Sequence, residues 1–278
     1  MIFVYAASEA RLRRTYPADV SLEAPDVMLA ARGQELVRSR GCMDCHGEAL
    51  AGKVVIDEQP FARIVGTPLG LRQGESPRAL HERMYRALHH GVDARGRSLL
   101  MMPSAQFASL SRREIEAMSA YVASLPRAKA PIPRSSLGPV ARSLLATGGL
   151  DGFLSAERID HRVPAIALEP TGGTFEQGRH LAQLCTGCHQ PNLAGGRMSH
   201  GGPAAPLASN LTPSNERFAA WTREDFLRAM RTGKRPDGTA IDGRYMPWRA
   251  IGQSSDEELS ALWIYLRSMP TEVGSDEP

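Results

Sequence analysis

The sequence Cys42-Met43-Asp44-Cys45-His46 returns later in the chain as Cys185-Thr186-Gly187-Cys188-His189. Two cysteines three positions apart place their sulfurs on one side of a helical turn, where both can add to the vinyl groups of a porphyrin. The histidine that follows then lies beneath the iron as its proximal ligand. We therefore predict two haem c groups, each with one iron. Cys42, Cys45 and His46 bind the first, and Cys185, Cys188 and His189 bind the second.

Other uses of paired cysteines fit this spacing poorly. The two pairs of a structural zinc site usually lie about 15–20 residues apart, whereas these pairs begin 143 residues apart. A thioredoxin-like dithiol needs one pair beside a βαβ pattern and gives no reason for the histidine or for a second copy. The motifs contain all four cysteines of the chain, so none remains for a disulfide or a nucleophile.

A long internal repeat extends beyond the motifs. Met102-Pro103 begins 56 residues after His46, and Met246-Pro247 begins 57 residues after His189. From there the two halves keep a constant offset of 144 residues. Met102, Ser111, Glu114, Tyr121 and Pro126 correspond to Met246, Ser255, Glu258, Tyr265 and Pro270. A period of this length indicates a duplicated domain rather than a solenoid repeat, and each copy has a usual domain size of about 100 residues.

Within each copy the local signals favour helices. Capping residues, capping boxes and a terminal glycine or proline mark the expected helix ends, and apolar side chains recur at helical spacing between them. No stretch alternates long enough to predict a sheet, so the predicted fold class is all-α. The expected helices are Asp26 to Cys42, Ser76 to Gly91 and Ser111 to Pro126 in the first copy, and Gly178 to Leu184, Thr222 to Gly233 and Ser255 to Pro270 in the second.

Each copy resembles a class I cytochrome c. In that family an N-terminal helix leads into the Cys-x-x-Cys-His motif, and a middle helix, a loop with an axial methionine before proline, and a C-terminal helix follow. The C-terminal helices end here as Tyr121-Val122-Ala123-Ser124-Leu125-Pro126 and Tyr265-Leu266-Arg267-Ser268-Met269-Pro270. The phrases Asn210-Leu211-Thr212-Pro213 and Met246-Pro247-Trp248 also resemble those of tandem di-haem cytochromes that serve bacterial periplasmic dehydrogenases and respiratory chains.

The sixth iron ligand decides whether a haem carries electrons or binds exogenous molecules. A thioether stabilises ferrous iron, so histidine–methionine ligation raises the reduction potential and closes the iron. Met246 is followed by proline and has no competing histidine nearby, and we expect it on the second iron. The family pattern and the constant offset favour Met102 on the first iron. Met101 and the pair His89-His90 remain alternatives there.

The resemblance also implies the organisation and location of the chain. Haem is attached to such motifs on the exported side of bacterial membranes, so we expect a periplasmic protein. The apolar opening is too short for a complete signal or a membrane span, and we expect it to be the remnant of a signal or of a membrane anchor. The expected parts are an N-terminal lead at 1–25, cytochrome c domains at 26–126 and 174–270 with a long extended linker at 127–173 between them, and a tail at 271–278.

Composition does not name a partner. The net charge of +3 is small and no basic run suggests nucleic acid. We expect an electron carrier without catalytic residues that links redox proteins, such as a dehydrogenase, a quinol-oxidising complex, an oxidase, a reductase or a reaction centre. The alternatives are a di-haem enzyme of the peroxidase kind, with one open or switchable haem, and a haem subunit of a larger complex.

Overall fold

The structure is a computed structural model that describes residues 2–127, 133–150, 152–198 and 205–270. The chain divides into two compact units, Met1–Ala167 and Leu168–Pro278, which we describe one at a time. The predicted tail at 271–278 lies outside the described residues.

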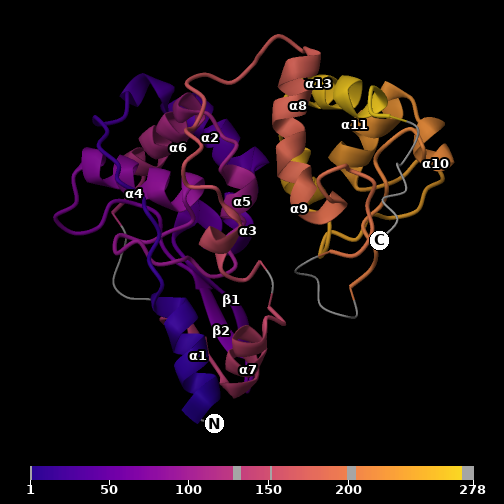
Figure 1. Ribbon diagram of the computed structural model, residues 1–278. Coiled ribbons are helices and arrows are strands. Elements are labelled where there is room, and N and C mark those ends of the chain that lie inside the picture. The colour runs from indigo at the N-terminus through magenta and orange to yellow at the C-terminus, as the bar shows by residue number, and fades with distance from the viewer. Residues whose placement is uncertain (1, 128–132, 151, 199–204, 271–278) are drawn as a thin grey trace. The chain divides into compact units, whose positions relative to one another are not determined.

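The first unit contains one set of helices around the motif and a second, smaller set beside a sheet (Figure 1). Its α-helices are α1 (Ile2–Arg13), α2 (Ala30–Ser39), α3 (Cys42–His46), α4 (Pro77–His89), α5 (Ser104–Phe107), α6 (Arg112–Ser124) and α7 (Pro139–Thr147). Short 3-10 turns, η1 (Val27–Leu29), η2 (Glu48–Leu50) and η3 (Ser155–Arg158), connect them.

In the part of the second unit that the structure describes, helices are joined by loops that contain two isolated β-bridges. Its helices are α8 (Phe175–Ala182), η4 (Gln183–Cys185), α9 (Thr186–His189), α10 (Glu216–Ala219), α11 (Arg223–Thr232), α12 (Trp248–Ile251) and α13 (Asp256–Arg267). Its buried core joins α8, α11 and α13 through Leu181, Phe226 and Leu259, which are at most 8% exposed.

Local capping sets the helix ends where the sequence predicts them. Ser76 caps α4, and its side chain accepts a hydrogen bond from the Ala79 amide. Ser111 with Glu114 forms a capping box at α6, and Ser255 with Glu258 forms the same box at α13. These predictions are confirmed.

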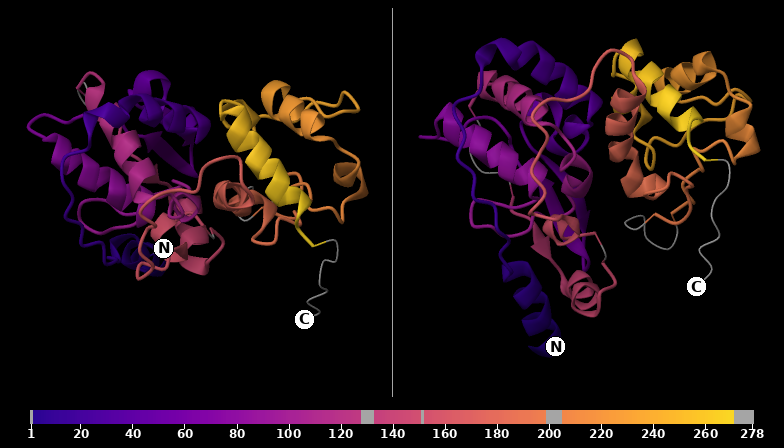
Figure 2. Two further views of the ribbon diagram at one scale, coloured as in Figure 1. Left: turned by 90° about the horizontal axis from the view of Figure 1, so that it is seen from above. Right: turned by 45° about the horizontal axis from the view of Figure 1, so that its top comes forward.

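A glycine in each unit permits two helices to cross closely. A β-carbon on Gly33 of α2 would lie 1.8 Å from the Ala117 carbonyl oxygen of α6, and one on Gly178 of α8 would lie 2.0 Å from that of Ala261 in α13. Figure 2 shows the crossing of α8 and α13 from above. The chain segment before each motif is therefore fixed against a later helix of its own unit, α6 in the first and α13 in the second.

A three-stranded antiparallel sheet corrects the all-α prediction for the first unit. The strands β1 (Lys53–Glu58), β2 (Ala62–Gly66) and β3 (Ser136–Leu137) pair in that order. Strand β1 is mostly exposed and β2 is mostly buried, so neither alternates between buried and exposed residues, and the two residues of β3 come from the predicted linker. The sheet lies against the motif, because a β-carbon on Gly66 would lie 1.9 Å from the Cys45 carbonyl oxygen.

The predicted N-terminal lead is ordered within the first unit. Helix α1 lies beside α7 (Figures 1 and 2). The Arg142 guanidinium of α7 donates to the Ser8 hydroxyl and to the Glu9 carboxylate, both at 3.1 Å, and the ring of Tyr5 lies 4.4 Å from its carbon Cζ. Among the described residues, no helix is both long and apolar enough to cross a membrane.

Much of the predicted linker also packs within the first unit. We call residues 133–167 the strap. The strap supplies β3 and α7, and its last carbonyl groups, those of Ile166 and Ala167, accept hydrogen bonds from the amides of Arg112 and Arg113. Those amides belong to the first turn of α6, which has no helical partner for them.

Candidate haem sites

Each motif forms a short helical segment that ends at its histidine. In the first unit Cys42, Cys45 and His46 all belong to α3, which begins after Gly41 in a left-handed conformation with φ 73°. In the second unit Cys185 ends η4, and Cys188 and His189 belong to α9. Among the described residues, none of the four cysteines forms a disulfide. Burial raises the pKa of the Cys42 thiol to about 12 and also raises the pKa of the Cys188 thiol.

The two motif histidines make the same hydrogen bond. His46 Nδ1 lies 2.7 Å from the Thr67 carbonyl oxygen, and His189 Nδ1 lies 2.7 Å from the Ser209 carbonyl oxygen. A carbonyl oxygen can only accept, so Nδ1 carries the proton and Nε2 keeps its lone pair. Burial lowers the pKa of both imidazoles, which favours the neutral form. Each histidine is thus oriented and in the tautomer that an iron ligand requires.

The sequence gives no direct signal for Thr67 and Ser209, because each contributes only a backbone carbonyl group. The two carbonyls lie 21 and 20 residues after their histidines. That near-equal separation is the one trace of them in the sequence, and it becomes meaningful only when the hydrogen bonds are seen.

The two predicted methionine loops have the same backbone turn. Pro103 has φ −78° and ψ 50°, and Pro247 has φ −77° and ψ 50°. The residue after each proline donates its amide to the methionine carbonyl, at 2.8 Å for Met102 and 2.7 Å for Met246. This is an inverse γ-turn, for which the proline ring already supplies the required φ.

Burial separates Met102 from its neighbour Met101. The Met101 side chain is 42% exposed and its backbone is left-handed, with φ 57°, whereas Met102 is half-buried. Met246 is also half-buried and packs against the same buried core as Cys185. The second unit therefore brings a predicted attachment cysteine and its predicted axial methionine to one apolar core.

The histidines that the sequence left as alternatives have protein partners. His89 Nδ1 lies 3.0 Å from the Ala108 carbonyl oxygen and Nε2 lies 3.1 Å from that of Val163. His90 Nδ1 lies 3.3 Å from His161 Nδ1. Both ring nitrogens of His89 are thus in contact with backbone carbonyl groups.

The donor set of each unit fits a covalently attached haem. It consists of two cysteine sulfurs outside any disulfide, one neutral imidazole nitrogen and one thioether. In addition, the Ser104 hydroxyl, two residues after Met102, is fully buried and has no hydrogen-bond partner within the described protein. A buried polar group without a protein partner is expected where a bound group completes a site.

A family model described as cytochrome c matches the chain twice, over residues 30–126 and 175–270. The chain belongs to the cytochrome c family. The two matched segments contain both motifs and both methionine loops. This cytochrome therefore carries two haem c groups and transfers electrons through them.

A relative of known identity supports the same conclusion. The cytochrome is 25% identical over 276 residues to the cytochrome c subunit of the quinone alcohol dehydrogenase from Gluconobacter oxydans (strain 621H). The match covers 88% of this cytochrome and 55% of the relative, so the chain spans about half the length of that protein.

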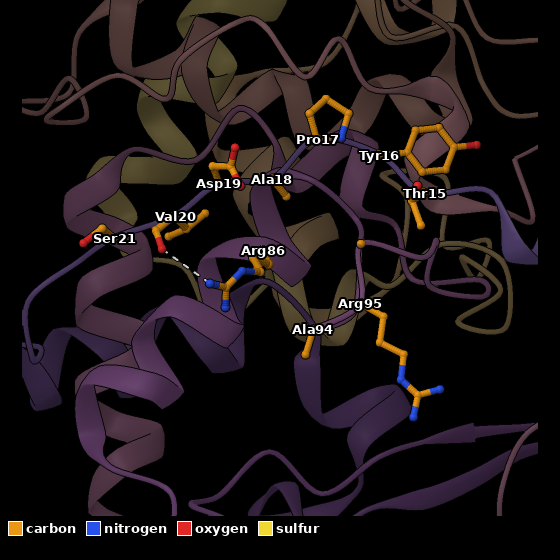
Figure 3. Close-up of a pocket in the computed structure, with 11 residues that line it drawn as sticks. Thr15, Tyr16, Pro17, Ala18, Asp19, Val20, Ser21, Arg86, Ala94 and Arg95 are labelled. Carbon is orange, nitrogen blue, oxygen red and sulfur yellow. Dashed lines mark hydrogen bonds between the residues drawn. The ribbon is translucent and has the colours of Figure 1, made fainter.

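A cavity of about 650 Å³ in the first unit of the cytochrome lies apart from the attachment residues (Figure 3). Residues 15–21, Arg86 and residues 94–96 line it, and the Arg86 guanidinium donates to the Val20 carbonyl oxygen at 3.4 Å. Neither cysteine of the motif nor Met102 is among the lining residues. We therefore assign the haem site from the ligand geometry and not from this cavity.

Proposed function

We propose that this cytochrome relays electrons from a periplasmic dehydrogenase through two haems with histidine–methionine ligation. His46 and Met102 would bind the iron of haem 1, which is attached through Cys42 and Cys45. His189 and Met246 would bind the iron of haem 2, which is attached through Cys185 and Cys188. The observation that carries this assignment is the duplicated geometry: both units have the same Nδ1 hydrogen bond and the same turn after the methionine.

The residues of the chain supply positioning. Bound haem supplies one-electron chemistry at its iron. The carbonyls of Thr67 and Ser209 hold the two imidazole rings in one orientation, and the proline turns hold the two thioethers. Groups that are held in place before the electron arrives need little rearrangement when the charge of the site changes.

The relative suggests the class of donor. It is the cytochrome c subunit of a dehydrogenase. A carrier with two haems is suited to accept electrons one at a time from an enzyme that removes two electrons from its substrate. In this proposal, substrate chemistry belongs to the dehydrogenase and the cytochrome is either its subunit or its acceptor. The cytochrome would act in the periplasm, where haem c proteins of this kind are assembled.

The first experiment is a near-infrared spectrum of the ferric protein, followed by addition of carbon monoxide to the ferrous protein. We expect the methionine-to-iron band at an intensity of two equivalents per chain and no binding of carbon monoxide. One equivalent, with carbon monoxide bound at the other iron, would contradict double histidine–methionine ligation and would favour a di-haem enzyme.

A second experiment tests the partner. Purified quinone-dependent alcohol dehydrogenase and its alcohol substrate are mixed with the ferric cytochrome, and the haem absorbance is followed by stopped flow. We expect reduction of both haems that needs enzyme and alcohol together. No reduction, with the cytochrome still reducible by dithionite, would exclude this class of dehydrogenase as the donor.

A further inference from the structure

The strap pairs with the loop that carries Met102. The Met101 amide donates to the Phe153 carbonyl oxygen at 2.8 Å, and the Ser155 amide donates to the Leu99 carbonyl oxygen at 3.1 Å. Leu100 and Leu154 form an antiparallel bridge between these two hydrogen bonds. The loop before Met102 is thereby held as one side of a short two-stranded ladder.

One side chain of the strap reaches the predicted ligand residue directly. The Ser155 hydroxyl donates to the Met102 carbonyl oxygen at 2.5 Å, and Ser155 is only 3% exposed. The next amide along, that of Ala156, donates to the Ser98 hydroxyl at 3.0 Å. The hydrogen bonds therefore continue on both sides of Ser155.

This part of the strap is anchored in the body of the first unit. Phe153 and Leu154 belong to a buried cluster with Ile64 of β2 and Leu145 of α7. All four side chains are at most 7% exposed. Because the cluster is packed at these positions, Ser155 cannot move away from the loop without disturbing buried apolar contacts. The hydroxyl is thus a fixed donor.

The second unit fills the equivalent place in a different way. A β-carbon on Gly91, after α4, would lie 3.0 Å from the β-carbon of Ser155, whereas one on Gly233, after α11, would lie 2.3 Å from the indole of Trp248. The glycine at the end of the middle helix is therefore covered by the strap in the first unit and by Trp248 in the second. Trp248 belongs to the methionine loop itself and Ser155 does not.

We propose that Ser155 is a positioning residue for Met102, through which the strap keeps the axial methionine on the iron of haem 1. The inference rests on the proposed ligation of that iron by Met102. Loss of the hydroxyl leaves the Met102 carbonyl with the Ser104 amide of its own turn and without its bond to the strap, which loosens the loop and lets an external ligand compete for the iron. Haem 2 belongs to the second unit, where Trp248 and not Ser155 lies against the glycine after the middle helix, so it does not depend on Ser155.

Imidazole titration of the ferric di-haem protein tests this proposal. The Met102→Leu and Met246→Leu variants assign the near-infrared band of each haem, and imidazole affinity is then measured at both irons in wild type and Ser155→Ala. We expect imidazole affinity at haem 1 to rise about tenfold, the equivalent of one buried hydrogen bond, with no change at haem 2. Ser155→Thr, which keeps the hydroxyl, should restore much of the wild-type affinity.

Control variants distinguish positioning of Met102 by Ser155 from a general loosening of the first unit. Ser143→Ala removes a hydroxyl that bonds only to the Pro139 carbonyl within α7 on the exposed face, and it should change neither haem. Equal affinities in wild type and Ser155→Ala, or an equal rise at both irons, would overturn the proposal. A wild-type protein without a methionine band at haem 1 would overturn the ligation by Met102 and, with it, the role of Ser155.

A second variant tests the same contacts if Ser155→Ala folds poorly. Ser98→Ala removes the acceptor of the Ala156 amide and leaves the Ser155 hydroxyl in place. We expect a smaller rise in imidazole affinity at haem 1 and faster deuterium exchange of the Met101 amide. Unchanged exchange and affinity would show that these strap contacts do not control the loop.

Discussion

Gly178 lies directly against the carbonyl oxygen of Ala261, so that a β-carbon at Gly178 would stand 2.0 Å from that oxygen. The obstacle is backbone, which cannot turn aside as a flexible side chain can. We expect Gly178→Ala to force α8 and α13 apart and to lower the free energy of unfolding of the second unit by about 2–4 kcal/mol. Thermal unfolding followed by circular dichroism measures this, with Gly238→Asn as the control. Gly238 has φ 84° and no atom near its missing β-carbon, and asparagine tolerates that backbone. Equal midpoints in the two variants would contradict the close crossing.

The first unit contains a buried ion pair. The Arg40 guanidinium lies 3.3 Å from the Glu114 carboxylate, and their side chains are 2% and 1% exposed. Arg40→Leu leaves a buried carboxylate without this cation, and we expect a loss of about 3–5 kcal/mol in the free energy of unfolding. The matched control is Arg63→Leu, which removes an exposed pair with Asp57 and should cost at most about 1 kcal/mol. Chemical denaturation of both variants checks the difference, and similar losses would count against it.

The neighbouring methionines of the first unit give opposite predictions. We expect Met102→Ala to remove half of the ferric near-infrared methionine band, because one of the two irons loses its thioether. Met101→Ala should keep the full band, since that side chain is 42% exposed. A spectrum of each variant decides between them. Loss of the band in Met101→Ala alone would reassign the ligand.

The second methionine loop contains an acid-sensitive contact. Hydrogen bonds from the Arg244 guanidinium, and then from the Arg244 amide, lower the pKa of Asp242 from 3.8 to about 2. Because the pKa is lowered in the folded state, the stabilisation is complete above about pH 3.8 and is lost as the pH falls through 2. Carboxyl carbon shifts in an NMR titration should give a midpoint near 2 in wild type and a higher one in Arg244→Ala. An unchanged midpoint in the variant would show that the guanidinium is not the cause.

Local sequence was enough to predict several elements of the fold. Helix α11 begins after Thr222 and ends before Gly233, as expected. A capping side chain and a left-handed glycine act on the nearest amides and carbonyls. The same holds for the capping boxes at Ser111 and Ser255. The constant offset of 144 residues places Met102 and Met246 in equivalent turns, which the matching dihedral angles of their prolines bear out.

Contacts between distant segments could not be predicted from the sequence. Strand β3 pairs two residues of the strap with residues of β2 that lie 75 and 73 positions earlier, and the Arg142 guanidinium binds Glu9 across more than 130 residues. The carbonyls of Thr67 and Ser209 act through the backbone, which every residue has. None of these contacts has a residue type or a spacing that would distinguish it in advance.

The sequence by itself determined that this protein binds two haems, because Cys-x-x-Cys-His places every attachment atom within five residues, and it determined where the main helices begin and end, because caps act over three or four residues. The tertiary structure alone decided the tautomer of each motif histidine, the sheet beside the first motif, and the contact of Ser155 with Met102, 53 residues away in the chain. Those features depend on which distant backbone groups meet once apolar surfaces are buried, and no local pattern records that outcome.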